Sequence, residues 1–193
     1  MRTAYALIGL GFIILFAATY FINRDFTTPH DTGVMNATST LALASPAFEQ
    51  GGSLPAQYTC DGAHISPPLS ISGAPPKTKS FALSVEDPDV PKAVLPSGLF
   101  VHWVLFNIPA TTTTIAEGTA PGIEGANGSG AIGYTGPCPP PQYEPARHRY
   151  FFYLYALDTV LDLKAGATKD ELMRAMQGHV LGQAEHMGTY QRQ

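Results

Sequence analysis

The sequence predicts a mainly β domain, an antiparallel β-sandwich of two packed sheets with a few short helices near its C-terminal end. Three apolar stretches carry this prediction: residues 80–85 (SFALSV), 99–108 (LFVHWVLFNI) and 150–157 (YFFYLYAL). Stretches that are apolar on both faces are typical of strands covered on both sides, as in a sandwich. The segments between them contain turn residues and little helical pattern, which favours antiparallel pairing.

In the longest stretch, residues 99–108, the expected alternation of side chains along a strand predicts which residues share a face of the sheet. His102, Val104 and Phe106 are expected on one face of this strand, because successive side chains of a strand point to opposite sides. The domain itself is expected to begin near Leu41, where Leu41-Ala42-Leu43 alternates as a strand does.

The helical signal is confined to the C-terminal part. Thr168 with Glu171 three residues later forms a capping-box pattern. The apolar stripe of Leu172, Ala175 and Met176 follows, and Gly178 is a suitable stop. A second short helix is expected over residues 180–187.

Composition limits the classes of function. The chain has 193 residues, of which 13% are charged, and its net charge is -4. A nucleic-acid-binding domain needs an excess of Lys and Arg to neutralise phosphates, so this class is excluded. The 45% of apolar residues suffices for a substantial core.

The N-terminal segment differs from the rest. Residues 4–22 carry no charge, which suits an uncleaved transmembrane helix, since crossing a bilayer takes about 20 apolar residues. We therefore expect a membrane anchor over 1–25, a linker over 26–40 and the β domain over 41–193. Arg2 before the span favours an extracytoplasmic domain by the positive-inside tendency. A cleaved signal peptide, which would leave a secreted or periplasmic domain, is the alternative.

Polar groups capable of chemistry stand where the predicted strands meet turns. Asp87-Pro88-Asp89 follows the first stretch, His102 lies inside the second, and His148-Arg149-Tyr150 leads into the third. Taken singly, each has a structural explanation: Asp beside Pro forms turns, and a buried imidazole needs only a hydrogen-bond partner. An adjoining carboxylate could be that partner.

Together, these fragments resemble the phosphatidylethanolamine-binding protein family, in its bacterial and archaeal branch of Raf-kinase-inhibitor-like proteins. The similarity runs from about residue 44 to 191. The matching fragments, in order, are Ser66-Pro67-Pro68-Leu69, Gly73-Ala74-Pro75, Asp87-Pro88-Asp89, His102-Trp103, Gly136-Pro137-Cys138-Pro139, His148-Arg149-Tyr150 and His179-Val180-Leu181-Gly182.

The resemblance implies a small anion-binding pocket. Its lining residues would be Asp87, His102, Gly136, Pro137, His148 and Tyr150, with Asp89 as a wall or supporting group. Imidazoles, a phenol and backbone N–H groups donate to phosphate oxygens, while Asp87 can accept from a ligand ammonium, so a phosphoethanolamine head group suits the pocket. If the histidines supply positive charge, anion affinity rises as pH falls from about 7.5 toward 6.

The expected function is therefore non-enzymatic binding of a small phosphate-bearing or other anionic ligand. The resemblance also implies modulation of a protein partner such as a kinase. The alternatives are a protein-interaction module with a vestigial pocket and a weak hydrolase. No G-x-S-x-G elbow supports a hydrolase. No cofactor is expected, and no metal, because the candidate ligands come singly and without short spacing.

Cys60 and Cys138 are the only two cysteines. In an extracytoplasmic domain they would form a disulfide, and in a reducing compartment they would be two free thiols. The sequence leaves both states open.

Overall fold

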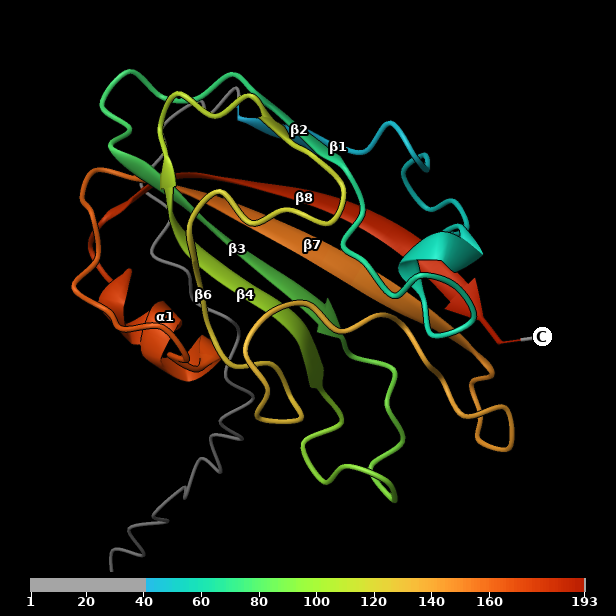
Figure 1. Ribbon diagram of the computed structural model, residues 1–193. Helices are drawn as coiled ribbons and strands as arrows, with labels where there is room; N and C mark the ends of the chain where they lie inside the picture. The colour runs from blue at the N-terminus through green and yellow to red at the C-terminus, as the bar shows by residue number, and fades with distance from the viewer. Residues whose placement is uncertain (1–40, 193) are drawn as a thin grey trace, which may run out of the picture. The chain divides into compact units, whose positions relative to one another are not determined.

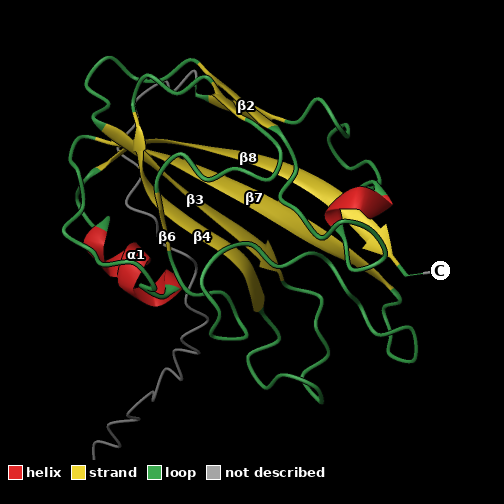
Figure 2. Cartoon of the chain, viewed as in Figure 1, coloured by secondary structure: helices red, strands yellow, loops and turns green. Residues whose placement is uncertain are grey.

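The computed structural model describes residues 41–192 (Figure 1). Within this range the chain forms eight β-strands, one α-helix and one short 3₁₀ helix (Figure 2). They are β1 (Ala42–Ala44), η1 (Ala56–Tyr58), β2 (Leu69–Ser72), β3 (Ser80–Asp87), β4 (Phe100–Pro109), β5 (Thr114–Ile115), β6 (Ile123–Glu124), β7 (Arg147–Leu157), α1 (Lys169–Ala175) and β8 (Val180–Gln191). The predicted anchor (1–25) and linker (26–40) lie outside the described residues. Within residues 41–192, no helix is long and apolar enough to cross a membrane.

The strands form two antiparallel sheets, as predicted. The larger sheet has the order β6-β4-β3-β7-β8, and the smaller has the order β1-β2-β5. The three apolar stretches of the sequence are β3, β4 and β7, which lie side by side in the centre of the larger sheet (Figure 1). Their central position explains why they are apolar on both faces.

Two apolar layers cover the larger sheet. One layer lies between the sheets, where Leu43 and Ile71 of the smaller sheet join Phe81, Leu105 and other side chains of the larger one. The second layer, on the opposite face, includes Ala82, Val104 and Phe106, together with Leu172 and Met176 of the α1 region. Burying these side chains supplies the main stabilising free energy of the domain.

Helix α1 forms as the sequence predicts. The Thr168 side chain accepts a hydrogen bond from the Glu171 backbone N–H, and the Glu171 carboxylate accepts one from the Thr168 backbone N–H. The Lys169 ammonium group also lies 2.6 Å from the buried Glu86 carboxylate of β3. The helix is thus capped and held against the sheet by both apolar and charged contacts.

The predicted second helix over residues 180–187 is wrong, because this segment is strand β8. It pairs with β7 along its length, from Leu157 opposite Val180 to Arg147 opposite Gln191. The residues buried in this strand stand at even positions, namely Gly182, His186, Gly188 and Tyr190. A period of two is the pattern of a strand, and glycines disfavour a helix interior.

The predicted face of His102 is also wrong. Val104 and Phe106 pack in the layer beneath α1, whereas the His102 ring contacts Tyr150, which belongs to the layer between the sheets. The pairing register of β3 and β4 shifts at this point, since Val85 is opposite Trp103 but Glu86 is opposite Val101. This β-bulge places His102 on the same side as Trp103, and simple alternation fails there.

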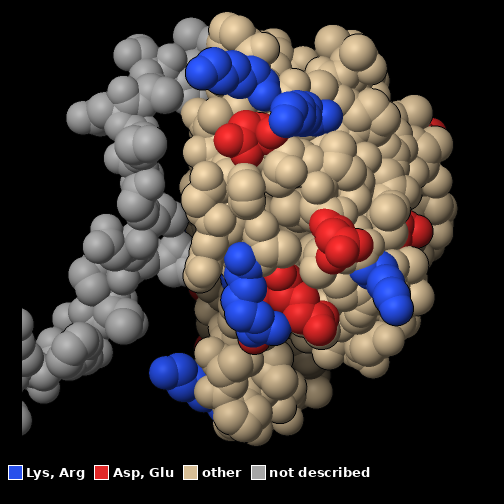
Figure 3. Space-filling model, turned by 90° about the vertical axis from the view of Figure 1, so that its left-hand side faces the viewer, with Lys and Arg blue, Asp and Glu red and all other residues tan. Residues whose placement is uncertain are grey.

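Charged groups are sparse on the side of the molecule where α1 lies. Among the residues drawn in colour there, acidic and basic side chains are interspersed, without one large basic patch (Figure 3).

Candidate functional site

Asp87 is the centre of a polar cluster at the end of β3. Its carboxylate is buried, and both oxygens accept hydrogen bonds. Oδ1 accepts from the Asp89 backbone N–H at 2.9 Å, and Oδ2 accepts from Nδ1 of His148 at 2.7 Å. Burial raises the pKa of Asp87 above its usual value, while the hydrogen bond from His148 acts in the opposite direction.

His148 approaches from the neighbouring strand β7. Because Nδ1 carries the proton that is donated to Asp87, Nε2 is the nitrogen left to interact with another group. Nε2 is buried and has no hydrogen-bond partner among the described residues. A buried polar atom without a partner is costly, so Nε2 is available to a further hydrogen-bonding group.

His102 completes the cluster from β4. Its Nδ1–H donates to the Thr135 carbonyl at 2.8 Å, and its Nε2 lies 4.0 Å from Oδ2 of Asp87. Burial lowers the pKa of His102 from 6.5 to about 4. The imidazole is therefore neutral at pH 7, and the predicted rise in anion affinity between pH 7.5 and 6 cannot come from His102.

Tyr150 supplies the second unpartnered atom. Its ring lies edge-on to His102, with 5.2 Å between ring centroids, and roughly parallel to His148 at 6.4 Å. Its hydroxyl is buried without a hydrogen-bond partner among the described residues. Burial, followed by the charge of Asp87, raises the pKa of Tyr150, so the hydroxyl keeps its proton and is an available donor.

Asp89 has a different role from the other predicted residues. Its carboxylate accepts two hydrogen bonds from the Arg149 guanidinium, at 2.7 and 2.8 Å, and a third from the Arg149 backbone N–H. Arg149 points away from His148 and is exposed, so this ion pair lies outside the cluster. Asp89 supports the site through its backbone, which holds Asp87 in place.

Gly136 and Pro137 belong to a loop beside His102, but their backbone groups are already used. The Gly136 N–H donates to Nε2 of His64, and the Pro137 carbonyl accepts from the Cys60 N–H. A Cβ at Gly136 would lie 2.8 Å from the Tyr58 carbonyl oxygen, so only glycine fits. The resemblance implied that backbone N–H groups donate to a ligand, but the Gly136 N–H is already donated to His64.

Two residues that hold this loop were not predicted. Thr135 accepts from His102 through its carbonyl and donates its N–H to the His102 carbonyl at 2.9 Å. His64 accepts the Gly136 N–H at 3.0 Å. Neither contact has a sequence signal, because each joins segments far apart in the chain.

Cys60 and Cys138 form a disulfide with 5.4 Å between their Cα atoms. The bond joins the loop around η1 to the loop of residues 134–138, and the Tyr134 hydroxyl adds a 2.8 Å hydrogen bond to the Tyr58 carbonyl. The segment that contacts His102 is thus fastened from one side by a covalent link and several hydrogen bonds.

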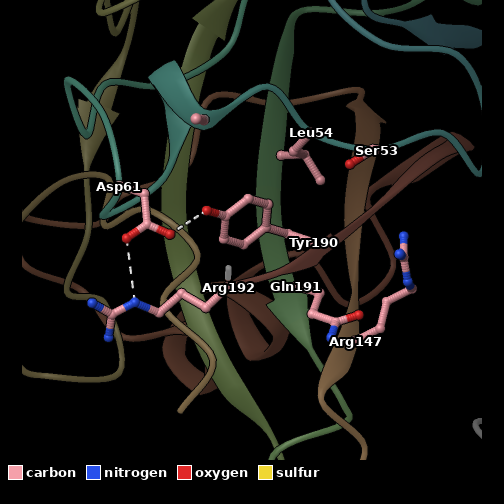
Figure 4. Close-up of a pocket in the computed structure, with 8 residues that line it drawn as sticks. Ser53, Leu54, Asp61, Arg147, Tyr190, Gln191 and Arg192 are labelled. Atoms are coloured by element: carbon pink, nitrogen blue, oxygen red, sulfur yellow. Dashed lines mark hydrogen bonds and ion pairs between the residues drawn. The ribbon is translucent and has the colours of Figure 1, made fainter. Parts of the chain in front are cut away.

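The cluster itself is closed. Its side chains belong to residues with exposed fractions of only 3% for Asp87, 5% for His102 and 1% each for His148 and Tyr150. A cavity of about 550 Å³ lies nearby at the end of β8, but its lining includes Arg147 and Tyr190 rather than the cluster (Figure 4). The predicted convergence of Asp87 with both histidines is observed, and the cluster is buried within the part of the chain that the structure describes.

The fold and the cluster define a class of protein: an antiparallel β-sandwich with a buried Asp–His–His–Tyr group at one end of its larger sheet. The chain belongs to the phosphatidylethanolamine-binding protein family, whose model matches residues 44–191.

Similar proteins are known in bacteria and archaea. The chain is 49% identical to a UPF0098 protein of Chlamydia muridarum over 152 residues, which are 78% of this chain and 99% of that protein. It is 50% identical to a UPF0098 protein of Methanothermobacter thermautotrophicus over 157 residues, 78% and 98% of the two chains.

Two solved structures have the same fold. One is a crystal structure of a phosphatidylethanolamine-binding protein homologue from Chlamydia trachomatis, with a TM-score of 0.76 and 46% identity, matching 81% of this chain and 100% of that chain. The other is YbcL of Escherichia coli, described as a member of the mammalian PEBP family, with a TM-score of 0.70 and 28% identity over 79% of this chain and 99% of that chain.

Proposed function

We propose that this protein binds a small phosphate-bearing ligand, such as a phosphoethanolamine head group, at the cluster around Asp87, and releases it unchanged. The observation that carries the proposal is the pair of buried atoms without partners, Nε2 of His148 and the hydroxyl of Tyr150. Family membership supports a ligand-binding role in general. A phosphate oxygen would satisfy the Tyr150 hydroxyl directly and would satisfy Nε2 once His148 is protonated.

The charge of Asp87 favours a zwitterionic ligand over a simple anion. A free phosphate would meet the carboxylate with a like charge, whereas the ammonium group of phosphoethanolamine could accompany the phosphate and offset that repulsion. Tighter binding of phosphoethanolamine than of inorganic phosphate is therefore part of the proposal.

Because the cluster is closed, binding requires a local opening. Because the cluster is closed, we also consider a second, rival function. In this alternative the cluster only stabilises the fold, and an outer surface of the domain contacts a protein partner.

Calorimetric titration of the purified full-length protein with phosphoethanolamine and with phosphate separates these functions. In Tyr150→Phe the ring remains and only the unpartnered hydroxyl is lost, so we expect affinity to fall about tenfold with folding retained. Arg174→Ala, which removes an exposed arginine of α1, is the control and should bind normally. Absence of heat with either ligand, or equal affinities in Tyr150→Phe and the wild type, would favour the rival. A turnover assay with the same protein addresses the hydrolase.

A further inference from the structure

A second feature able to recognise a ligand is the cavity at the end of β8. It has a volume of about 550 Å³ and is lined by Ser53, Leu54, Ala56, Asp61, Arg147, Tyr190, Gln191 and Arg192 (Figure 4). Its residues come from four places in the chain: the segment that leads into η1 together with the first residue of η1, the loop after η1, the start of β7, and the end of β8 with the residue after it.

The cavity exists because one edge of β8 is covered only in part. Residues 51–54 run along this edge, where the Thr189 N–H donates to the Gly52 carbonyl and the Leu54 N–H donates to the Thr189 carbonyl. Pro55 then directs the chain into η1, away from the strand. Among residues 41–192, no strand lies beside β8 on this side beyond Thr189.

This arrangement leaves a backbone donor facing the cavity. In an antiparallel strand, alternate residues direct their N–H and carbonyl groups to the same edge. The Gln191 N–H therefore points to the side used by Thr189, and it has no hydrogen-bond partner among the described residues. An unpaired N–H group at a strand edge is ready to bind an acceptor.

The charges around the cavity favour an acceptor that is an anion. Arg147 has no ion pair within the described residues, and Arg192 contacts Asp61 only through Nε, at 3.3 Å. The other oxygen of Asp61 accepts the Tyr190 hydroxyl. The one carboxylate of the lining is thus engaged on both oxygens, while the guanidinium of Arg147 and the terminal nitrogens of Arg192 remain available.

We propose that this cavity is a second ligand site, which binds the carboxylate or phosphate group of a small molecule. Arg147 and Arg192 lie on opposite sides of Gln191, with their guanidinium groups directed apart (Figure 4), so an anion beside Gln191 would accept from one guanidinium group and from the Gln191 N–H. The side chains of Leu54 and Ala56 provide an apolar wall for the uncharged part of the ligand.

The site is separate from the cluster around Asp87. None of the cluster residues lines the cavity, although Tyr190 of its lining lies opposite His148 in the pairing of β7 with β8. Binding in the cavity requires no opening of the closed cluster. The proposal of a second site therefore does not depend on the proposed function.

Nuclear magnetic resonance of the arginine side chains tests the proposal on the full-length protein. Titration with inorganic phosphate and, separately, with succinate should shift the Nε–Hε signals of Arg147 and Arg192. The Arg149 signal, held by Asp89, and the exposed Arg174 signal serve as internal controls in the same spectrum. A response to only one probe identifies the preferred group.

Affinities measured on variants of the two kinds of arginine, inside and outside the cavity, test the proposal without assignment of individual signals. In Arg147→Ala we expect the affinity of the responding probe to fall about tenfold, as for loss of a charge-assisted hydrogen bond. Arg147→Lys should bind with intermediate affinity because the charge remains without the planar fork. Arg174→Ala should leave this site unchanged. Shifts equal in all four arginines, no shift with either probe over the millimolar range, or equal losses in Arg147→Ala and Arg174→Ala would overturn the proposal.

Discussion

The Nδ1–H group of His148 donates a 2.7 Å hydrogen bond to the Asp87 carboxylate, although 61 positions separate the two residues in the chain. The contact fixes which nitrogen of His148 faces the carboxylate and which is free. It also explains how a carboxylate can stay buried beside apolar rings, since its oxygens are satisfied by one imidazole and one backbone N–H. The free Nε2 is then a consequence of the fold, available to a ligand.

Asp87 and Asp89 allow a comparison between a buried hydrogen-bonded pair, Asp87 with His148, and an ion pair with an exposed arginine, Asp89 with Arg149. Asp87→Ala would leave Nδ1 of His148 buried without an acceptor, and we expect it to lower the free energy of unfolding by about 1–3 kcal/mol or more. Asp89→Ala breaks an ion pair whose arginine side chain is 53% exposed, so a loss of at most about 1 kcal/mol is expected. Urea denaturation of both variants measures the difference. Equal losses would show that Asp87 has no special structural role.

Tyr150→Phe should make the free protein more stable while it weakens ligand binding. The hydroxyl is buried without a partner, so its removal relieves a desolvation cost of about 1–3 kcal/mol without creating a large cavity. Thermal unfolding without ligand provides the measurement. Tyr134→Phe is the matched control, because the Tyr134 hydroxyl does have a partner, the Tyr58 carbonyl, and its loss should be destabilising. Destabilisation by Tyr150→Phe would mean that the hydroxyl is satisfied in solution.

The sequence predicts best what depends on neighbouring residues. Strands β3, β4 and β7 are long apolar runs, and the capping box of α1 lies within four consecutive residues, so each is visible locally. Strand β8 was mistaken for a helix because its side chains are mostly small or polar and its partner is β7, which only the fold brings alongside.

For the candidate site, the residue types were predictable and their surroundings were not. The resemblance named Asp87 and both histidines, and they do converge. The bulge that turns His102 toward Tyr150 depends on a register shift between two strands. The cavity beside Arg147 depends on where residues 51–54 leave the edge of β8, and no local pattern marks that point.

Burial of His102 predicts a specific dependence of stability on pH. The folded pKa is about 4 and the ordinary value is 6.5, so between these values the unfolded chain binds more protons than the folded chain. The free energy of unfolding therefore rises with pH in this window, and stability is lost as pH falls. From pH 7 to pH 4 this imidazole should account for a loss of about 3 kcal/mol.

Urea denaturation of the wild type and His102→Asn across that window isolates the contribution. The variant lacks the titrating group and should have the shallower profile, while the carboxylates titrate in both proteins. Parallel profiles would indicate that His102 is already accessible to protons in the folded state.

The disulfide should couple the stability of the domain to the environment of His102. Cys60 and Cys138 stand 78 positions apart, and in the chain-entropy model closing a loop of this length contributes about 4 kcal/mol. The bond also fastens the loop whose Thr135 carbonyl accepts from His102. In the double variant Cys60→Ser, Cys138→Ser we expect a lower free energy of unfolding and a His102 pKa that moves from about 4 toward 6.5, because a looser loop admits water. Nuclear magnetic resonance titration of the His102 ring measures the second effect. If stability falls but the His102 pKa stays near 4, the hydrogen bonds to Thr135 and His64 hold the loop without the covalent link.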